Sequence, residues 1–302
     1  MSLITIGTVA LDNLVTPSGK KESLLGGSAS HFSVCARLFT PVNLVSVIGK
    51  DFPDKHLKFF KKKGINLDSV TISDGKTFSW TGEYKKEDLN TAITHTTVLG
   101  VLEQYTPQVA AEQKKIPNVF LANFDPDIQM SFLKLMSNPK FIGMDTMNLW
   151  IDIKNKSVKN LMKKVHLMIV NDREAKLLTE ETNLHKAAKA IRRMGPGMVV
   201  IKKGENGVMF YSDQHHFAFS AYPVETVVDP TGAGDSFAGG LMGYLSQTGR
   251  VTQKALHKAL LYATTLSSYN VEGFGMAKTA DLTMTGVNGR LKELCKHIMP
   301  VV

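Results

Sequence analysis

The stretch Val228-Asp229-Pro230-Thr231-Gly232-Ala233-Gly234-Asp235-Ser236-Phe237-Ala238-Gly239-Gly240 is the most informative part of this sequence. Its two glycines flank an alanine just before a long helical run, so backbone N–H groups can turn inward at a helix N-terminus. Unpaired amides and the helix dipole favour an anion there. A carboxylate in the first helical turn can then accept the proton of a hydroxyl while the amides hold a phosphoryl group. Asp235 is therefore a candidate general base, and Gly232, Ala233 and Gly234 are a candidate anion hole.

The short Gly-x-Gly pattern alone is weak, because any tight turn before a helix can contain it. Asp235 would then be an ordinary first-turn residue. Two other phosphate-binding loops are excluded more firmly. The chain has no Gly-x4-Gly-Lys-Ser/Thr, so it is not a P-loop protein. The dinucleotide-binding fingerprint requires a third glycine where this chain has Phe237.

Outward from this stretch, short β-branched runs alternate with amphipathic helical stretches, which predicts an α/β fold with a mostly parallel sheet flanked by helices. The expected strands are residues 3–9, 42–48, 118–122, 141–145, 166–170 and 198–201. The expected helices between them are residues 28–38, 54–63, 128–136, 154–163, 173–178 and 184–194. A hairpin at 207–211 and 216–219 follows, and then three helices starting near Gly232, Thr252 and Asp281.

Residues 77–99 break this alternation, because they read as two strands without a crossover helix. Together with residues 11–24 they are expected to form a small β lid over one end of the core. An ordinary edge hairpin is the alternative. The chain is therefore expected to be a single domain over residues 1–302, with lid segments near 11–24 and 77–99. The lid strands offer an edge that can pair between subunits, so a homodimer through the lid is possible.

The composition indicates where the protein is expected to function and which classes of partner are not expected. The two cysteines, Cys35 and Cys295, show no pairing pattern, and no run approaches the roughly 18 apolar residues of a membrane span. No signal peptide is evident, so the expectation is a cytoplasmic protein without a membrane partner. The net charge of +9 comes from scattered lysines that are not interleaved with aromatic residues. No nucleic-acid partner is therefore expected.

The string from Asp229 to Gly240 resembles the second signature of the ribokinase-like (PfkB) carbohydrate kinase family. Other motifs of that family occur in the expected order along nearly the whole chain: Gly7-x4-Asp12, Gly26-Gly27-Ser28-Ala29-Ser30-His31, Gly49-Lys50-Asp51, Asn171-Asp172-Arg173-Glu174 and Lys203-Gly204-Glu205-Asn206-Gly207. The resemblance implies a ribokinase-like three-layer sandwich with a mostly parallel central sheet and a small β lid. It also implies ATP and Mg²⁺ as phosphoryl donor and cofactor.

The resemblance also assigns roles to individual residues. A sugar or sugar-like molecule would supply the acceptor hydroxyl; the alternatives are a nucleoside acceptor or, with less support, a catalytically silent nucleotide-binding regulator. The implied substrate-binding residues are Asp12, Gly26, Gly27 and His31. The implied nucleotide-binding residues are Lys203, Gly204 and Gly207, and Asn171 and Glu174 would place Mg²⁺ and the phosphates. A monovalent cation such as K⁺ would bind at Asp229, Thr231 and Gly273.

Two positions depart from the family pattern. His31 stands where an asparagine usually contacts substrate, and it could instead be a helix-face histidine packed among Phe32 and Val34. Lys202 stands where the family more usually has a threonine, directly before the turn expected to contact the nucleotide. Solvated charge at a strand end is the alternative for Lys202 and Lys203.

Several further positions are candidates on weaker grounds. Residues 145–148, Asn123 and Asp125 follow strand ends, where ligands gather in open α/β sheets, although a plain turn is the alternative. Phe78, Trp80 and Tyr84 alternate in the expected lid, so they serve either substrate recognition or packing. His215 and His216 lack further metal-ligand spacing and are expected in a surface turn.

Overall fold

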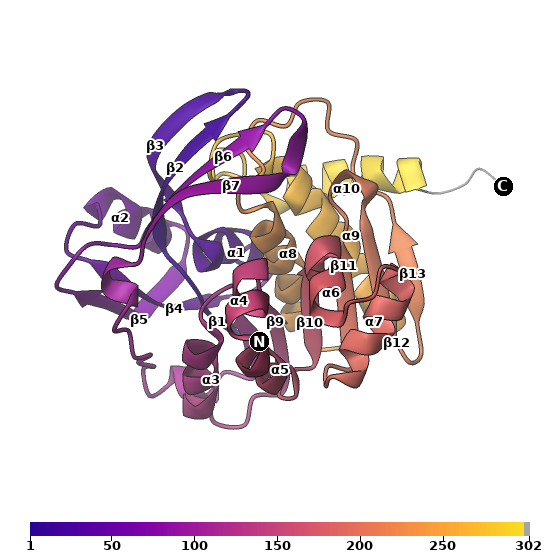
Figure 1. Ribbon diagram of the computed structural model, residues 1–302, viewed down its shortest axis with the longest axis horizontal. Coiled ribbons are helices and arrows are strands. Elements are labelled where there is room, and N and C mark those ends of the chain that lie inside the picture. Colours follow the sequence, from indigo (N-terminus) through magenta and orange to yellow (C-terminus); the bar gives the residue numbers. More distant parts are fainter. Residues whose placement is uncertain (299–302) are drawn as a thin grey trace.

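The computed structural model describes residues 1–298, and its larger sheet has nine strands in the spatial order β13-β12-β11-β10-β9-β8-β1-β4-β5 (Figure 1). Six strand pairs are parallel, and β12 runs antiparallel to β11 and β13. The strands are β1 (Leu3–Ile6), β4 (Val42–Gly49), β5 (Ile65–Ser73), β8 (Asn118–Leu121), β9 (Phe141–Asp145), β10 (Leu167–Asn171), β11 (Met198–Lys202), β12 (Val208–Ser212) and β13 (His216–Phe219). The predicted mostly parallel sheet is confirmed.

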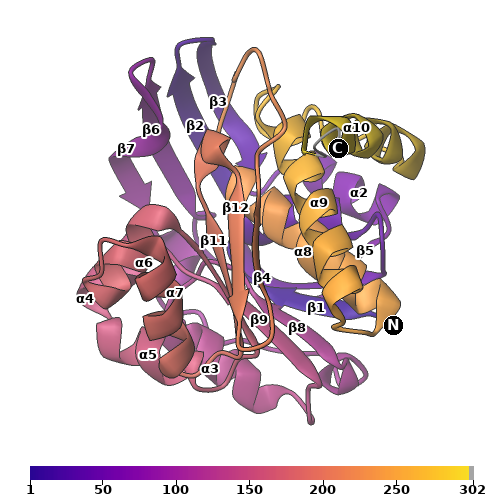
Figure 2. The same ribbon diagram turned by 90° about the vertical axis from the view of Figure 1, so that its right-hand side faces the viewer.

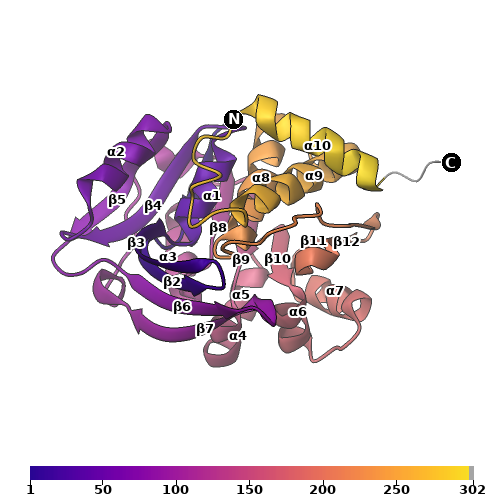
Figure 3. The same ribbon diagram turned by 90° about the horizontal axis from the view of Figure 1, so that it is seen from above.

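Helices cover both faces of this sheet, because its central strands are mostly apolar and their residues are buried on both sides. One face carries α1 (Ser28–Ala36), α2 (Asp54–Lys62), α8 (Ala233–Thr248) and α9 (Gln253–Asn270). The other carries α3 (Pro126–Leu135), α4 (Asn148–Ile153), α5 (Asn155–Met162), α6 (Asp172–Thr179) and α7 (Leu184–Arg193). The two helical layers lie on opposite sides of the strands in Figure 2. Helix α10 (Met284–Ile298) packs on the outside of α9, and Figure 3 shows it at the rim.

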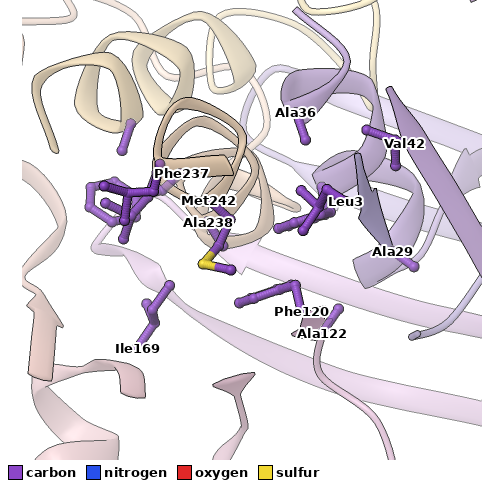
Figure 4. Packing of buried hydrophobic residues seen from close by; sticks show 14 of the residues in the cluster. Leu3, Ala29, Ala36, Val42, Phe120, Ala122, Ile169, Phe237, Ala238 and Met242 are labelled. Atoms are coloured by element: carbon purple, nitrogen blue, oxygen red, sulfur yellow. The ribbon is translucent and has the colours of Figure 1, made fainter. Parts of the chain in front are cut away.

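The core on the α8 side packs α8 and α1, two helices that border the candidate site, against the sheet. Figure 4 shows Leu3 of β1, Phe120 of β8 and Met242 of α8 within one buried apolar cluster. Phe32 of α1 stacks on Phe120, with ring centroids 4.3 Å apart and planes 3° from parallel. This packing fixes α1 and α8 against the sheet.

Glycines let α8 approach its neighbours unusually closely. A Cβ atom at Gly239 would lie 2.4 Å from the Phe32 carbonyl oxygen of α1. A Cβ at Gly240 would lie 2.9 Å from the Ala263 Cα of α9. Any larger residue at these two positions would therefore push α8 away from α1 or α9. The close packing determines where the N-terminus of α8 points.

A second, smaller sheet has the strand order β3-β2-β6-β7, with β2 (Ala10–Thr16), β3 (Gly19–Gly26), β6 (Ser79–Lys85) and β7 (Asp88–Val98). Strands β2 and β6 pair in parallel, and the outer pairs are antiparallel. Both segments expected to form a lid lie in this sheet, which projects from one end of the larger sheet in Figure 1. Alternate residues of β2, including Asp12, Leu14 and Thr16, are buried, so this face of the small sheet points toward the body of the protein.

The structure differs from the sequence prediction in a few elements. The expected strand over residues 3–9 is shorter than predicted, because β1 ends at Ile6. A Cβ at Gly7 would lie 2.7 Å from Ser28 Oγ and 2.8 Å from Ala122 Cβ, so this glycine allows close packing where the strand ends. Strand β5 and helix α4 were not predicted, and the last helix begins at Met284 rather than near Asp281. None of the helices within residues 1–298 combines the length and apolar character needed to cross a bilayer.

Candidate active site

The polar residues of the candidate site follow the carboxyl ends of neighbouring parallel strands. Asp145 ends β9, Asn171 ends β10 and Lys202 ends β11. In open α/β sheets, ligands bind at this edge. The N-terminus of α8 and the inner face of β2 complete the site, bringing Asp235 and Asp12 to the same place.

The N-terminus of α8 is shaped by Gly232, which precedes the helix with φ = 75°. A Cβ at this position would also lie 2.3 Å from His31 Nδ1, so both conformation and space require glycine. The Ala233 N–H donates to the Pro230 carbonyl at 3.2 Å. The next amides, those of Gly234 and Asp235, belong to the first turn, where the helix supplies no acceptor. The predicted anion hole therefore has the geometry of a helix N-terminus.

Asp235 is enclosed beside this turn. Burial raises its pKa to about 7, the Asp145 carboxylate adds to the rise, and Lys202 opposes it. A carboxylate with a pKa near neutrality can release a proton and take one up under ordinary conditions. Asp235 is thus suited to act as a general base.

Lys202 lies at the centre of a group of carboxylates. Its Nζ donates to Asp145 Oδ2 at 3.1 Å, and its side chain is 18% exposed. Burial alone would lower the pKa of Lys202, but Asp145, Glu174 and Asp235 together raise it above the ordinary value. Lys202 therefore remains a cation and is not the solvated strand-end charge that the sequence left open.

Asn171 and Glu174 form a reciprocal cap at the start of α6. The Asn171 Oδ1 atom accepts from the Glu174 N–H, and Glu174 Oε2 accepts from the Asn171 N–H, each at 2.7 Å. Burial raises the pKa of Glu174 to about 8, although the Lys202 ammonium opposes the rise. The two predicted Mg²⁺ and phosphate residues are therefore held together, with one oxygen of each already used in the cap.

Asp12 lies over Gly26 on the opposite side of the site. A Cβ at Gly26 would lie 1.9 Å from Asp12 Oδ2, so the carboxylate occupies the space that a side chain would need. Burial raises the pKa of Asp12 to about 7, and hydrogen bonds from the Gly27 and Trp80 backbone amides lower it in part. Gly27 has φ = 93° and precedes α1. Asp12, Gly26 and Gly27 are thus brought together as predicted.

His31 lies beneath the Gly232 turn and is 2% exposed. Its Nδ1 lies 3.1 Å from the Asn270 Oδ1 atom, which also accepts from the Ser236 hydroxyl at 2.8 Å. The Asn270 Nδ2 group donates to the Thr231 carbonyl at 2.7 Å. Burial lowers the pKa of His31, so its ring is neutral. Asn270 ties α1 and α9 to the anion-hole turn, and no sequence motif pointed to it.

The predicted cation residues are partly engaged by the backbone. Asp229 is fully buried; its Oδ1 accepts from the Thr231 N–H at 2.9 Å and its Oδ2 from the Gly275 N–H at 2.8 Å. The Asp229 N–H in turn donates to the Val271 carbonyl at 3.2 Å, so the segment containing Gly273 runs beside it. Within residues 1–298, no group of three or more His, Cys, Asp or Glu side chains is arranged to hold a metal ion.

The loop containing Lys203, Gly204 and Gly207 is a tight turn after β11. The Lys203 N–H donates to the Gly207 carbonyl at 2.8 Å, and both glycines have positive φ, 55° and 84°. A Cβ at Gly204 would lie 2.4 Å from Asn90 Oδ1 of β7. The Asn90 Nδ2 group donates to Glu205 Oε2 at 2.7 Å. The β6–β7 hairpin of the small sheet therefore reaches across the site to this loop.

The aromatic residues within β6, and Phe78 just before it, divide between packing and the site. Phe78 packs against the core on the α3–α7 side, so packing is its role. The Tyr84 hydroxyl lies 3.5 Å from Thr231 Oγ1, and burial raises the pKa of Tyr84 to about 12. The Trp80 ring covers Gly82, since a Cβ there would lie 2.1 to 2.6 Å from three atoms of the indole. Trp80 and Tyr84 are two residues either side of Gly82, so all three share one face of the strand.

The weaker candidates are engaged in local structure. The Asn123 Oδ1 atom accepts from the Trp150 indole N–H at 3.1 Å, and Asp125 pairs with the Lys154 ammonium at 2.7 Å. The backbone N–H of Ser212 donates to the His215 carbonyl at 2.8 Å, which closes the turn between β12 and β13. Of the two histidines expected in a surface turn, His215 lies in the turn, whereas His216 is the first residue of β13.

The fold is a mostly parallel α/β sandwich. At its strand ends a helix N-terminus suited to an anion lies beside a carboxylate whose pKa is raised by burial. This combination is typical of a phosphotransferase that acts on a hydroxyl group. The chain belongs to the pfkB family of carbohydrate kinases, whose model matches residues 8–281. The resemblance seen in the sequence motifs is thereby confirmed.

Individual relatives agree with this assignment. The cytidine kinase of Thermococcus kodakarensis is 30% identical over 252 residues, covering 81% of this chain and 88% of that protein. The crystal structure of the Methanocaldococcus jannaschii nucleoside kinase, an archaeal member of the ribokinase family, superposes with a TM-score of 0.77 at 20% identity, covering 97% of this chain and 99% of the other. An Escherichia coli protein assigned as ribokinase II, in complex with ATP and Mg²⁺, gives a TM-score of 0.81 at 20% identity, with coverage of 97% and 99%. The expected ribokinase-like fold is confirmed.

Proposed function

We propose that this protein transfers the γ-phosphoryl group of ATP to a hydroxyl of a nucleoside, with Asp235 as general base. The observation that carries the nucleoside assignment is the pairing of Asp12 with Trp80 in neighbouring strands β2 and β6. Directly paired residues in neighbouring strands place their side chains on the same face of a sheet. A carboxylate that can accept sugar hydroxyls thus lies beside an aromatic ring that can stack on a base.

The orientation of Trp80 supports this role. Its indole lies across Gly82, and its Nε1 donates to Thr94 Oγ1 at 3.1 Å, so the ring is held along the strand. Glycine at position 82 leaves room for the ring to lie flat. Base–aromatic stacking contributes about 1–3 kcal/mol per base. A free sugar would gain much less from this surface, whereas a nucleoside would use both Asp12 and Trp80.

The comparison with known proteins points the same way, since the cytidine kinase of T. kodakarensis is 30% identical over most of both chains. A free sugar or polyol remains the second candidate. It is favoured by Asp12 and Gly26, whose cradle needs only hydroxyl groups, and by the ribokinase II likeness.

The residues of the site suit the proposed donor. Oxygen atoms are the ligands that Mg²⁺ prefers, and Glu174, in the first turn of α6 directly after β10, keeps one carboxylate oxygen outside the cap. Asn171 would hold Glu174 in place through its side-chain oxygen. Mg²⁺ there would neutralise phosphate charge and orient the donor. The Lys203–Gly207 turn would hold the nucleotide, and the first-turn amides of α8 would hold the phosphoryl group. Asp229, Thr231 and the segment at Gly273 are the proposed surroundings of a monovalent cation.

The acceptor hydroxyl and the base Asp235 would then lie on the same side of the phosphoryl group, and the leaving ADP would lie on the other side. Asp12, Gly26 and Gly27 would fix the sugar, and His31 would support the Gly232 turn from below. Asp235 would take the proton of the attacking hydroxyl as the new O–P bond forms and the bond to ADP breaks. The small sheet would act as a lid that excludes water, and its exposed edge is the proposed site for pairing with a second copy.

The test measures ADP release with ATP and Mg²⁺ over cytidine, uridine, inosine, adenosine, D-ribose and D-fructose. We expect turnover with one or more nucleosides. Trp80→Ala should raise the nucleoside KM about 10-fold or more, because it removes the stacking surface. Thr97→Ala is the matched control, since this exposed threonine pairs with Trp80 on β7. Turnover with a free sugar that is insensitive to Trp80→Ala would favour the second candidate.

A further inference from the structure

The ammonium group of Lys202 lies against the anion-hole turn. Lys202 is the last residue of β11, and its side chain crosses to the N-terminus of α8. A Cβ at Gly234 would lie 2.8 Å from Lys202 Nζ. The ammonium therefore lies directly beside the Gly234 backbone, within the turn whose amides are proposed to hold the phosphoryl group.

The hydrogen bonds of this ammonium are incompletely used. An ammonium group has three N–H donors, and one of them points to Asp145 Oδ2 at 3.1 Å. Within the described part of the chain, Asp145 is the hydrogen-bond partner found for this group. The Lys202 side chain is 18% exposed and the Asp145 side chain 5%, so the cluster opens on the lysine side. Two donors thus remain for a ligand.

The charges of the site make such a ligand contact necessary. Asp145, Glu174 and Asp235 all lie close enough to Lys202 to raise its pKa. A phosphoryl group entering beside three acidic side chains would be repelled by those that are ionised, and the amides of one helical turn carry only partial positive charge. A fixed cation at the same turn offsets this repulsion.

We propose that Lys202 is a catalytic residue that donates hydrogen bonds directly to the phosphoryl group in transit. This inference rests on the proposed phosphoryl transfer. The acceptor oxygen forms a bond to phosphorus, the bond from phosphorus to the leaving oxygen of ADP breaks, and the hydroxyl proton passes to Asp235. Lys202 keeps its protons throughout. Its contact strengthens as negative charge builds on the phosphoryl oxygens.

The competing explanation is that Lys202 merely neutralises the buried Asp145 carboxylate. The paired variant Lys202→Met/Asp145→Asn separates the two roles, because it removes the cation without leaving Asp145 charged and alone. If Lys202 is a neutraliser, this variant should retain turnover within about 3-fold of the wild type. If Lys202 contacts the phosphoryl group, kcat should fall about 100-fold or more. Asp145→Asn alone and Lys189→Met, on the exposed surface of α7, are the controls.

Binding provides a readout that does not depend on the acceptor. We expect the paired variant to bind the non-hydrolysable ATP analogue AMP-PNP with Mg²⁺ about 10-fold more weakly, and ADP within 2-fold of the wild type. Equal losses for both nucleotides, or none for either, would overturn the inference. If the wild type binds AMP-PNP but phosphorylates no acceptor, the proposed function fails while the comparison of AMP-PNP with ADP still decides the role of Lys202.

Discussion

The His31 Nδ1 atom and the Asn270 Oδ1 atom lie 3.1 Å apart beneath Gly232, although they are 239 residues apart in the chain. The same Asn270 side chain also bonds to Ser236 and to the Thr231 carbonyl. This one asparagine therefore holds the end of α9, the start of α8 and helix α1 at the anion-hole turn.

Asn270→Ala should lower both stability and turnover. It leaves the buried Ser236 hydroxyl and Thr231 carbonyl without their partner, which costs about 1–3 kcal/mol for each group. We expect a lower unfolding temperature and a kcat reduced about 10-fold, because the Gly232 turn loses its support. Chemical denaturation and steady-state kinetics measure the two effects. An unchanged kcat in the folded variant would show that the turn does not depend on Asn270.

Asp235→Asn should retain the fold and nucleotide binding but lose about 1000-fold or more in kcat, because the amide cannot accept the acceptor proton. Single-turnover ADP release and AMP-PNP binding measure the two properties. Asp172→Asn, which changes an acidic residue in the first turn of α6 instead, is the matched control. Wild-type turnover in Asp235→Asn would contradict the role of this carboxylate as base.

The pH dependence of the rate follows from the same carboxylate. The pKa of Asp235 is raised to about 7, chiefly by burial, so the base is protonated and inactive in acid. We expect kcat/KM to rise with pH and to level off above about pH 7. A profile that is flat from pH 5 to pH 8 would argue against a base with this pKa. The Asp12 carboxyl, whose pKa is also about 7, would contribute to the same rise in kcat/KM with pH.

The free energy of unfolding should fall as pH rises, whereas the reaction rate should increase. The native pKa of Asp235 is about 7 and the ordinary value is 3.8, so the folded state binds more protons than the unfolded state between these pH values. The free energy of unfolding therefore falls as pH rises through this range. Asp235→Asn should stabilise the protein at pH 8 by on the order of 2–4 kcal/mol and by less at pH 5. Thermal unfolding at both pH values tests this, and an equal effect at each would contradict it.

Gly26→Ala should impair the acceptor side of the site selectively. The added methyl group would meet Asp12 Oδ2 at 1.9 Å, so the carboxylate must move away from its place in the cradle. We expect the acceptor KM to rise about 10-fold or more while AMP-PNP binding stays within 2-fold of the wild type. Gly289→Ala, where nothing crowds the added Cβ in α10, is the control. Parallel loss of nucleotide binding would indicate a wider disturbance.

Much of the fold could be predicted from the sequence because its signals are local. The apolar runs that became β1, β4, β8 and β9 are short, continuous and bounded by polar residues, and the Gly-Ala-Gly turn directly precedes a long helix. Strand β5 was missed because its buried and exposed residues do not alternate regularly. Helix α4 was missed because its six residues are too few to show a helical period.

The site was predictable where a motif is contiguous and not where it depends on tertiary contacts. Asp12 and Gly26 were identified separately, but the carboxylate's fit over the glycine appears only once β2 and β3 pair. Asn270 sits in an ordinary stretch of α9, so nothing local distinguishes it. The role of Lys202 is ambiguous in the sequence for the same reason, since a lysine at a strand end is usually solvated, and Asp145 comes from β9, which lies two strands away in the sheet.

Because α8 is closely packed at Gly239 and Gly240, the residues of the phosphoryl-transfer reaction and those that select the acceptor lie on elements with different freedom to change. The helix that carries Asp235 cannot shift without repacking α1 and α9, so the phosphoryl-transfer machinery varies little without loss of the fold. Strand β6 is under no such restriction, because it lies in the small sheet and its side chains are partly exposed. Substitutions there can accumulate without harming the reaction. A lineage of such proteins could therefore acquire new acceptors through β6 while inheriting α8 unchanged.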